Sequence, residues 1–243
     1  MTAIQTIDLC RAFGSVQAVN RLNLSVEEGE IYALLGVNGA GKTTTIRMLS
    51  CLLEPDSGDA LLLGHSIVDE PAEVKRIINI SPQETAVARN LTVQENLLLI
   101  AQIYGFSGKE AAARTTELVN ALELESVRTR KAGTLSGGYQ RRLSIAMALV
   151  SRPKILFLDE PTLGLDVLAR RALWAFIEKL RGSMTVILTT HSMDEAEALS
   201  DRIGIVSDGS LRACGTAQEL MARTQTDSFE DAFVRLVSKE ANL

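Results

Sequence analysis

Residues 30–44 read EIYALLGVNGAGKTT, in which a short apolar strand runs directly into a glycine-rich loop. Within it, Gly36–Thr43 matches the pattern G-x-x-x-x-G-K-[ST] at every fixed position. Glycines let such a loop turn with its N–H groups pointing inward, and the N-terminus of the following helix adds a partial positive charge. The pattern therefore predicts a loop that cradles the phosphates of a nucleotide.

Two residues of this loop carry specific chemistry. Lys42 supplies a mobile positive charge for the β- and γ-phosphates, and the hydroxyl of Thr43 is a ligand for Mg²⁺. We therefore expect ATP and Mg²⁺ as the bound groups. The predicted nucleotide contacts are Gly36, Val37, Asn38, Gly39, Ala40, Gly41, Lys42, Thr43 and Thr44. The alternative, a chance glycine-rich turn, does not account for the strand before the loop and the helix after it.

A second apolar strand, Ile155–Leu158, ends in two carboxylates, Asp159 and Glu160. Ligands gather at the carboxyl ends of the strands of a parallel sheet, so Asp159 is expected beside the Mg²⁺. Neighbouring residues on an extended strand point to opposite faces, so the two acids need not share a role. We predict that Asp159 holds the metal through its water shell and that Glu160, as general base, polarises the attacking water.

A serine followed by two glycines, Ser136-Gly137-Gly138, precedes a predicted helix. At the least this is a helix N-cap with a permissive backbone. The same geometry can bind an anion through the hydroxyl and the free N–H groups. The residues by themselves favour the cap.

Strand-like and helical segments alternate along the chain, except in one block that is helical throughout. Strands are predicted at Ala3–Leu9, Arg21–Glu28, Glu30–Leu35, Ala60–Leu63, Arg76–Ser81, Ile155–Leu158, Met184–Thr190 and Arg202–Ser207. Helices are predicted at Lys42–Leu53, Thr92–Tyr104, Lys109–Leu124, Gly138–Ser151, Val167–Arg181 and Met193–Leu199. With the phosphate loop, the pattern indicates an α/β fold: a P-loop NTPase core with a mostly parallel sheet, an N-terminal antiparallel β part and an inserted α-helical subdomain.

This order also predicts the domain organisation. The core comprises residues 1–82 and 153–215, and the helical subdomain comprises residues 83–152. An amphipathic helical extension follows over residues 216–243. No internal repeat interrupts the arrangement.

Composition narrows the function classes. The 243 residues include 25 basic and 30 acidic side chains, a net charge of −5, which argues against nucleic acid as a partner. Three dispersed cysteines and two histidines follow no zinc or disulfide spacing, which favours reduced thiols in the cytosol. Asp8 and Arg11 interrupt the first apolar stretch, and no run approaches the roughly 20 apolar residues of a membrane span. We expect neither a signal peptide nor a membrane-crossing segment.

Four motifs together resemble the nucleotide-binding subunit of ABC transporters, over about residues 1–215. They are GVNGAGKTT, LSGGYQRR (135–142), ILFLDEP (155–161) and TTH (189–191). The segment LSGG, Leu135–Gly138 here, resembles the signature of that family. In the family two such domains pack head to tail, and the signature of each closes over the partner's phosphate loop. The resemblance implies that Ser136, Gly137 and Gly138 meet the γ-phosphate held by a second nucleotide-binding subunit. With one phosphate loop and one signature, the chain is expected to form a homodimer or to pair with a homologue.

The resemblance also assigns single residues. Gln83 matches the glutamine that reaches the Mg²⁺ and the attacking water, and His191 matches the switch histidine that contacts the γ-phosphate. Asp166 lies in the segment that communicates across the dimer. Phe13 stands where the family stacks an aromatic ring on adenine, although a role in a small core stays open.

NGAGKTTTIRML, ENLLLIAQIYG and LSGGYQRRL resemble the exporter branch whose ATPase serves a separate six-span membrane subunit. This implies an ATPase that powers export through a transmembrane permease, held on the cytoplasmic face of the membrane. A helix of the permease would enter a groove around Glu84–Leu97. Ser228–Leu236 resembles a helix near the C-terminus of such subunits; the alternative is an ordinary amphipathic helix that packs on the core. The alternative is a soluble ABC-type ATPase without a transport role.

Overall fold

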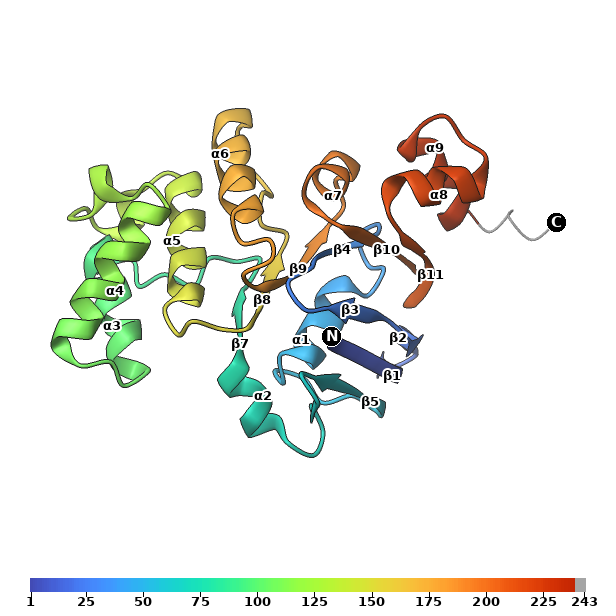
Figure 1. Cartoon of the computed structure of the whole chain (residues 1–243), viewed down its shortest axis with the longest axis horizontal. Coiled ribbons are helices and arrows are strands. Elements are labelled where there is room, and N and C mark those ends of the chain that lie inside the picture. Colours follow the sequence, from blue (N-terminus) through green and yellow to red (C-terminus); the bar gives the residue numbers. More distant parts are fainter. Residues whose placement is uncertain (239–243) are drawn as a thin grey trace.

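The computed structural model describes residues 1–238 and contains two β-sheets. A helical subdomain lies on one side of the sheets and a C-terminal helix pair lies on the other (Figure 1). Within residues 1–238, none of the helices is both long and apolar enough to cross a bilayer.

The larger sheet has six strands in the order β11-β10-β4-β9-β8-β7. All neighbours are parallel except β11, which runs antiparallel to β10. The strands are β4 (Ile31–Leu35), β7 (Ile78–Ser81), β8 (Ile155–Asp159), β9 (Thr185–Thr190), β10 (Arg202–Ser207) and β11 (Ser210–Gly215). The central strands β4, β8 and β9 are buried along their whole length, as expected for a sheet covered on both faces; β4 and β8 are almost entirely apolar, and β9 has an apolar centre.

The smaller sheet is antiparallel and has the order β2-β1-β5-β6, with β3 paired to β1. Its strands are β1 (Thr2–Phe13), β2 (Val16–Leu22), β3 (Ser25–Glu27), β5 (Ser57–Leu62) and β6 (His65–Ser66). The two sheets together confirm the predicted α/β class, with a mostly parallel sheet and an N-terminal antiparallel part.

Strand β4 separates two hydrophobic cores because its side chains alternate between the two faces of the sheet. Ile31, Ala33 and Leu35 contribute to one core, together with α6 (Val167–Glu178) and α7 (Met193–Leu199). Tyr32 and Leu34 contribute to the other, with α1 (Lys42–Leu49) and the antiparallel sheet. The phosphate loop, which joins β4 to α1, is therefore anchored in packed structure at both ends.

The helical subdomain contains α3 (Val93–Ile103), α4 (Gly108–Ala121) and α5 (Gly137–Leu149). Capping boxes begin the first two: Thr92 pairs with Glu95, and Ser107 pairs with Glu110. The predicted helices are present, with ends one to three residues from the expected ones. The domain boundaries at residues 83 and 152 stay a prediction.

Several predicted elements were wrong in extent or type. The helix from Lys42 ends at Leu49, and Cys51 follows with a left-handed φ of 54°. The segment predicted as a strand from Arg76 begins instead as the end of α2 (Pro71–Ile77), because Pro71 starts a helix that buries Val74. The segment from Arg21 is split between β2 and β3, whose partners both lie on β1.

Strand β11 was missed, although its signal is in the sequence. Asp208 and Gly209 form a two-residue connection from β10 and have φ angles of 50° and 73°. Asp-Gly between two apolar runs is a strong hairpin signal, because both residues accept positive φ.

The predicted C-terminal helical extension begins as α8 (Ala217–Thr224) and α9 (Phe229–Val237), which pack on each other and on β10 and β11. Phe229 and Ala232 are buried in this contact. Residues 239–243 of the predicted extension lie outside the described residues.

The connection from β7 to α3 is held by one buried amide. Asn96 is fully buried, and its side chain accepts a hydrogen bond from Ala88 N at 2.8 Å and donates to Ala88 O at 3.1 Å and Thr92 O at 2.8 Å. Because replacement by alanine removes these partly buried hydrogen bonds and leaves the Ala88 N–H without its acceptor, Asn96→Ala should lower the free energy of unfolding by about 1–3 kcal/mol. Urea denaturation measures this loss. Asn120→Ala, on the exposed face of α4, is the control and should leave stability unchanged; equal stability of the two variants would contradict the expectation.

Candidate active site

The phosphate loop requires glycine at positions where its backbone meets other segments. A Cβ atom at Gly36 would lie 2.4 Å from Val206 O, and one at Gly41 would lie 2.3 Å from Ala18 O. Gly41 also has a φ of 101°, which side chains rarely adopt. The glycines therefore let the loop pack closely against β2 and β10 while its amide groups surround the pocket.

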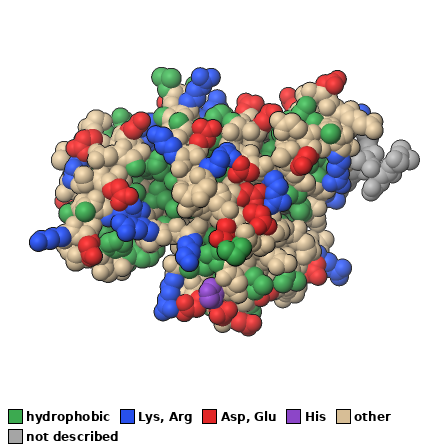
Figure 2. Space-filling model, in the orientation of Figure 1, with side chains coloured by type: hydrophobic (Ala, Val, Ile, Leu, Met, Phe, Trp, Pro, Cys, Tyr) green, Lys and Arg blue, Asp and Glu red, His purple; other side chains and the backbone are tan. Residues whose placement is uncertain are grey.

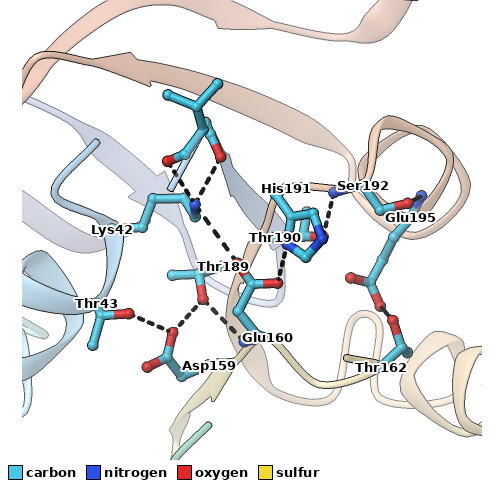
Figure 3. A network of polar contacts seen from close by, with 12 residues as sticks. Lys42, Thr43, Asp159, Glu160, Thr162, Thr189, Thr190, His191, Ser192 and Glu195 are labelled. Atoms are coloured by element: carbon cyan, nitrogen blue, oxygen red, sulfur yellow. Dashed lines mark hydrogen bonds and ion pairs between the residues drawn. The ribbon is translucent and has the colours of Figure 1, made fainter. Parts of the chain in front are cut away.

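Lys42 lies inside this loop with 6% of its surface exposed. Its Nζ donates to Gly36 O at 2.7 Å and to Val37 O at 3.2 Å, and it lies 3.6 Å from Glu160 Oε1 (Figure 3). Burial lowers the pKa of Lys42, and the charges of Glu160 and Asp159 oppose that shift. The chain thus holds a cation at the centre of the loop and pairs it with the predicted base.

Thr43 and Asp159, the predicted metal ligands, lie side by side. Thr43 Oγ1 donates to Asp159 Oδ1 at 3.1 Å, and Asp159 is 3% exposed. Hydroxyl and carboxylate oxygens are the ligand types that Mg²⁺ prefers, and Mg²⁺ takes its remaining ligands from water and phosphate. Among residues 1–238 no group of three or more His, Cys, Asp or Glu side chains could form an all-protein metal site. The donor set fits a Mg²⁺ ion that is shared with a nucleotide.

Glu160 is held in a strained backbone conformation directly after β8. Its φ is 48°, and its N–H lies 3.0 Å from Thr189 Oγ1 and 3.2 Å from Thr189 O. The carboxylate is 7% exposed, and its Oε2 lies 2.8 Å from His191 Nδ1. Strain of this kind persists only where the surroundings enforce it, and it occurs often at functional sites. The different orientations of Asp159 and Glu160 thus depend on a left-handed residue as well as on strand alternation.

One pocket of about 440 Å³ joins several predicted site residues. It is lined by Asn38–Thr44 together with Ala18, Gln83, Glu160, Leu163 and His191. Gln83 reaches it from the exposed connection after β7. Segments distant in the sequence therefore meet here, since the carboxyl ends of β4, β7, β8 and β9 share one edge of the sheet.

The remaining predicted site residues lie outside the lining of this pocket. Ser136 is exposed at the N-cap position of α5, and its side chain makes no capping hydrogen bond within the described part of the chain. Asp166 caps α6 by accepting a hydrogen bond from Ala169 N at 2.9 Å. Phe13 is 47% exposed at the end of β1, with the Arg11 guanidinium 5.1 Å from the centre of its ring.

Thr189 received no role in the sequence analysis, although it joins the two neighbouring acids, Asp159 and Glu160. Its hydroxyl donates to Asp159 Oδ1 and accepts from Glu160 N, so one side chain sets both neighbours (Figure 3). Thr189 lies directly opposite Asp159 in the register of β8 and β9. Only the strand pairing identifies it, because the residues are thirty positions apart.

A second layer supports the segment around His191. Glu195, which is 1% exposed, accepts from Thr162 Oγ1 at 2.7 Å and from Trp174 Nε1 at 3.1 Å. Burial raises the pKa of Glu195, and hydrogen bonds from Thr190, Thr162 and Trp174 oppose the shift. These contacts tie the start of α7 to the segment that follows Glu160.

Comparison with known proteins places this geometry in a family. The chain is 43% identical over 219 residues, or 90% of its length, to the daunorubicin/doxorubicin resistance ATP-binding protein of Streptomyces peucetius. It is 40% identical over 228 residues, or 93%, to a doxorubicin resistance ATP-binding protein of Mycobacterium tuberculosis. The chain covers 66% and 67% of these two relatives, and so spans about two thirds of their length.

Solved structures agree with the fold. A structure described as the ATP-binding subunit of an ABC transporter superposes with a TM-score of 0.85 at 29% identity, covering 96% of this chain and 99% of that one. The ATP-binding cassette MJ0796, in a dimer bound to ADP and Pi, gives a TM-score of 0.79 at 28% identity, covering 88% of this chain and 98% of that one. The predicted P-loop NTPase fold is confirmed. Because the sequence model of the family described as ABC transporter also matches residues 19–163, the chain belongs to the ABC transporter family as an ATP-binding cassette.

Proposed function

We propose that this chain binds ATP with Mg²⁺ and hydrolyses it as the peripheral subunit of a membrane exporter. The observation that carries the proposal is the convergence of Lys42, Glu160 and His191 on the pocket of the phosphate loop. A buried cation for the phosphates, beside a carboxylate hydrogen-bonded to an imidazole, suits the attack of water on a phosphoanhydride.

Each residue of the pocket has a distinct task in this reaction. Lys42 binds the β- and γ-phosphates. Its ammonium group, which lies 3.6 Å from Glu160 Oε1 in this structure, then no longer neutralises that carboxylate. Glu160 accepts the proton of the attacking water, while His191 orients the carboxylate through Nδ1. Thr43 and Asp159 would hold Mg²⁺, which neutralises charge on the phosphates when bound. Gln83 lines the same pocket and would contact the metal and the attacking water.

Thr189 is expected to set the metal affinity, because its hydroxyl orients the Asp159 carboxylate. Thr189→Val keeps the shape of the side chain and removes this bond, so the Mg²⁺ concentration for half-maximal ATPase activity should rise about 10- to 100-fold. A titration of ATPase activity with Mg²⁺ measures the change. Thr189→Ser keeps the hydroxyl and is the matched control. A valine variant with the metal dependence of the serine variant would exclude this role.

The exposed signature supports a dimer as the active form. The Ser136 hydroxyl makes no capping bond at the start of α5 in the described part of the chain, yet Ser136 does not line the pocket of its own chain. A second nucleotide-binding subunit, most simply another copy of this chain, would bring its signature over the phosphate loop. The dimeric cassette MJ0796 supports this arrangement.

A dimeric active form makes ATPase activity depend on protein concentration. Activity per molecule should fall in proportion to concentration once most chains are monomeric, because dimers then form by mass action. Serial dilution of the purified chain with saturating ATP and Mg²⁺ measures this dependence.

Glu160→Gln should bind ATP without hydrolysing it and elute as a dimer from a sizing column with ATP and as a monomer without it. Constant activity per molecule at all dilutions, or wild-type hydrolysis by Glu160→Gln, would refute the proposal.

The membrane partner is expected at an apolar groove beside Gln83. The groove, of about 180 Å³, lies between the segment after β7, α3 and α5; its lining residues include Ile80, Pro82, Ala86, Ile100, Tyr104 and Met147. The expected region Glu84–Leu97 overlaps it only at Ala86, since the apolar walls come from later on α3 and from α5. Exposed Leu99 and Ile103 extend this apolar surface, which suits a helix of a six-span permease.

Drug-resistance relatives support export of a drug-like molecule, with the substrate selected by the permease. On the face drawn in Figure 2, basic and acidic side chains are interspersed rather than collected into one basic surface, which supports a protein partner over nucleic acid. The chain would then lie at the cytoplasmic face of the membrane through this partner.

Ala86 provides a test of the groove, because it is exposed and lines it. Ala86→Glu places a charge among apolar groups and should abolish co-purification of the tagged chain with a six-span protein from native membranes. ATPase activity of the isolated chain should stay unchanged. Ala113→Glu, on the exposed face of α4, is the control. If both variants recover the membrane protein equally, the groove is not its binding site.

A further inference from the structure

Arg141 is a buried arginine on the helix that begins at the signature. It is 4% exposed, and within residues 1–238 its guanidinium donates to backbone carbonyls only. Nε donates to Pro161 O at 2.9 Å, Nη2 to Asp159 O at 2.5 Å, and Nη1 to Pro82 O and, at 3.3 Å, to Gln83 O. One side chain of α5 thus holds two separate segments of the active site.

These carbonyls belong to the residues that flank the catalytic groups. Asp159 and Pro161 lie on either side of Glu160, so both neighbours of the strained residue are anchored to one planar guanidinium. The other two carbonyls belong to Gln83 and the residue before it. A left-handed residue other than glycine persists only where its surroundings enforce it, and these bonds supply that constraint.

The charge of Arg141 also serves the site. Burial lowers the pKa of Arg141 to about 10, and the charges of Asp159, Glu195 and Glu160 oppose the shift. The guanidinium therefore stays charged at neutral pH, behind the catalytic carboxylates. Its fork of five N–H donors matches several carbonyls at once, which a lysine ammonium cannot do.

The position of Arg141 on α5 links the site to the dimer contact. Helix α5 begins at Gly137, directly after Ser136, and Arg141 lies about one turn further along. A displacement of the signature end of this helix therefore passes through Arg141 to the backbone around Glu160 and Gln83.

We propose that Arg141 is a positioning residue for hydrolysis that holds Glu160 and Gln83 in place. When the nucleotide bound to the partner engages the signature of this subunit, Arg141 transmits that contact to Glu160 of the same subunit. This inference rests on the proposed ATPase function. It assigns Arg141 no contact with the nucleotide, so its loss should reduce kcat while leaving KM for ATP unchanged.

Replacement by glutamine tests the proposal against a purely structural role. Arg141→Gln should lower kcat on the order of 100-fold, the cost of misplacing a catalytic group by about 1 Å. The dissociation constant of a fluorescent ATP analogue should not change. Arg114→Gln is the matched control, since Arg114 is 8% exposed and donates to Leu149 O and Val150 O at the far end of α5. It should lose thermal stability to a similar degree and keep its kcat. Arg141→Lys retains the charge with fewer aligned donors and should show intermediate activity.

Mixed dimers separate the role in the same subunit from a role across the dimer. In each, Glu160→Gln in one subunit stops hydrolysis there but keeps ATP bound, so only one site can work while both signatures stay engaged. Arg141→Gln in the subunit with intact Glu160 should slow that site, whereas Arg141→Gln in the Glu160→Gln subunit should not.

Three results would overturn the proposal: wild-type kcat in Arg141→Gln, equal kcat losses in Arg141→Gln and Arg114→Gln, or equal slowing in both mixed dimers. Should Arg141→Gln not fold, the kcat and KM of Arg141→Lys decide, and unchanged kcat there refutes the role. Wild-type protein without ATPase activity would instead count against the proposed function.

Discussion

The carboxylate of Glu160 is the point on which the site depends, because it is buried, charged and fixed by a residue with positive φ. Removing a carboxylate from water is costly unless charges and hydrogen bonds compensate. Here Lys42 and His191 contact the side chain, while Thr189 binds the backbone N–H. These partners come from α1, β9 and the segment after β9, so the Glu160 carboxylate reaches its position only when the parallel sheet has assembled.

The helical subdomain is joined to this site by buried polar contacts, several of them from Arg141 to backbone carbonyls. Arg141 reaches from α5 to the carbonyls around Glu160 and Gln83, and Ser81 and Ser144 share a buried hydrogen bond of 3.0 Å between β7 and α5. Carbonyl contacts of this kind specify position without depending on neighbouring side chains. The subdomain therefore carries an exposed signature at one end of α5 and, about one turn further along, contacts the segments around Glu160 and Gln83.

Some expectations failed for reasons that are local and physical. The strand predicted at Arg76–Ser81 starts two residues too early, because Arg76 and Ile77 end a helix that Pro71 begins. The Asp208-Gly209 turn carried a readable signal for β11, yet a short final strand has no periodicity long enough to stand out. Two helices were predicted to end too far along the chain, at Leu53 and Arg181. They end at Leu49 and Glu178, because the apolar spacing continues into the turns that follow.

By itself, the sequence determined the α/β class, the phosphate loop, the acids at 159 and 160, and the family, because these are local patterns with fixed spacing. It could not determine that Thr189 joins the two acids or that Arg141 holds the loops. Those facts depend on strand register and on the placement of α5 against the sheet. Both are decided by packing between segments far apart in the chain, which no local pattern encodes.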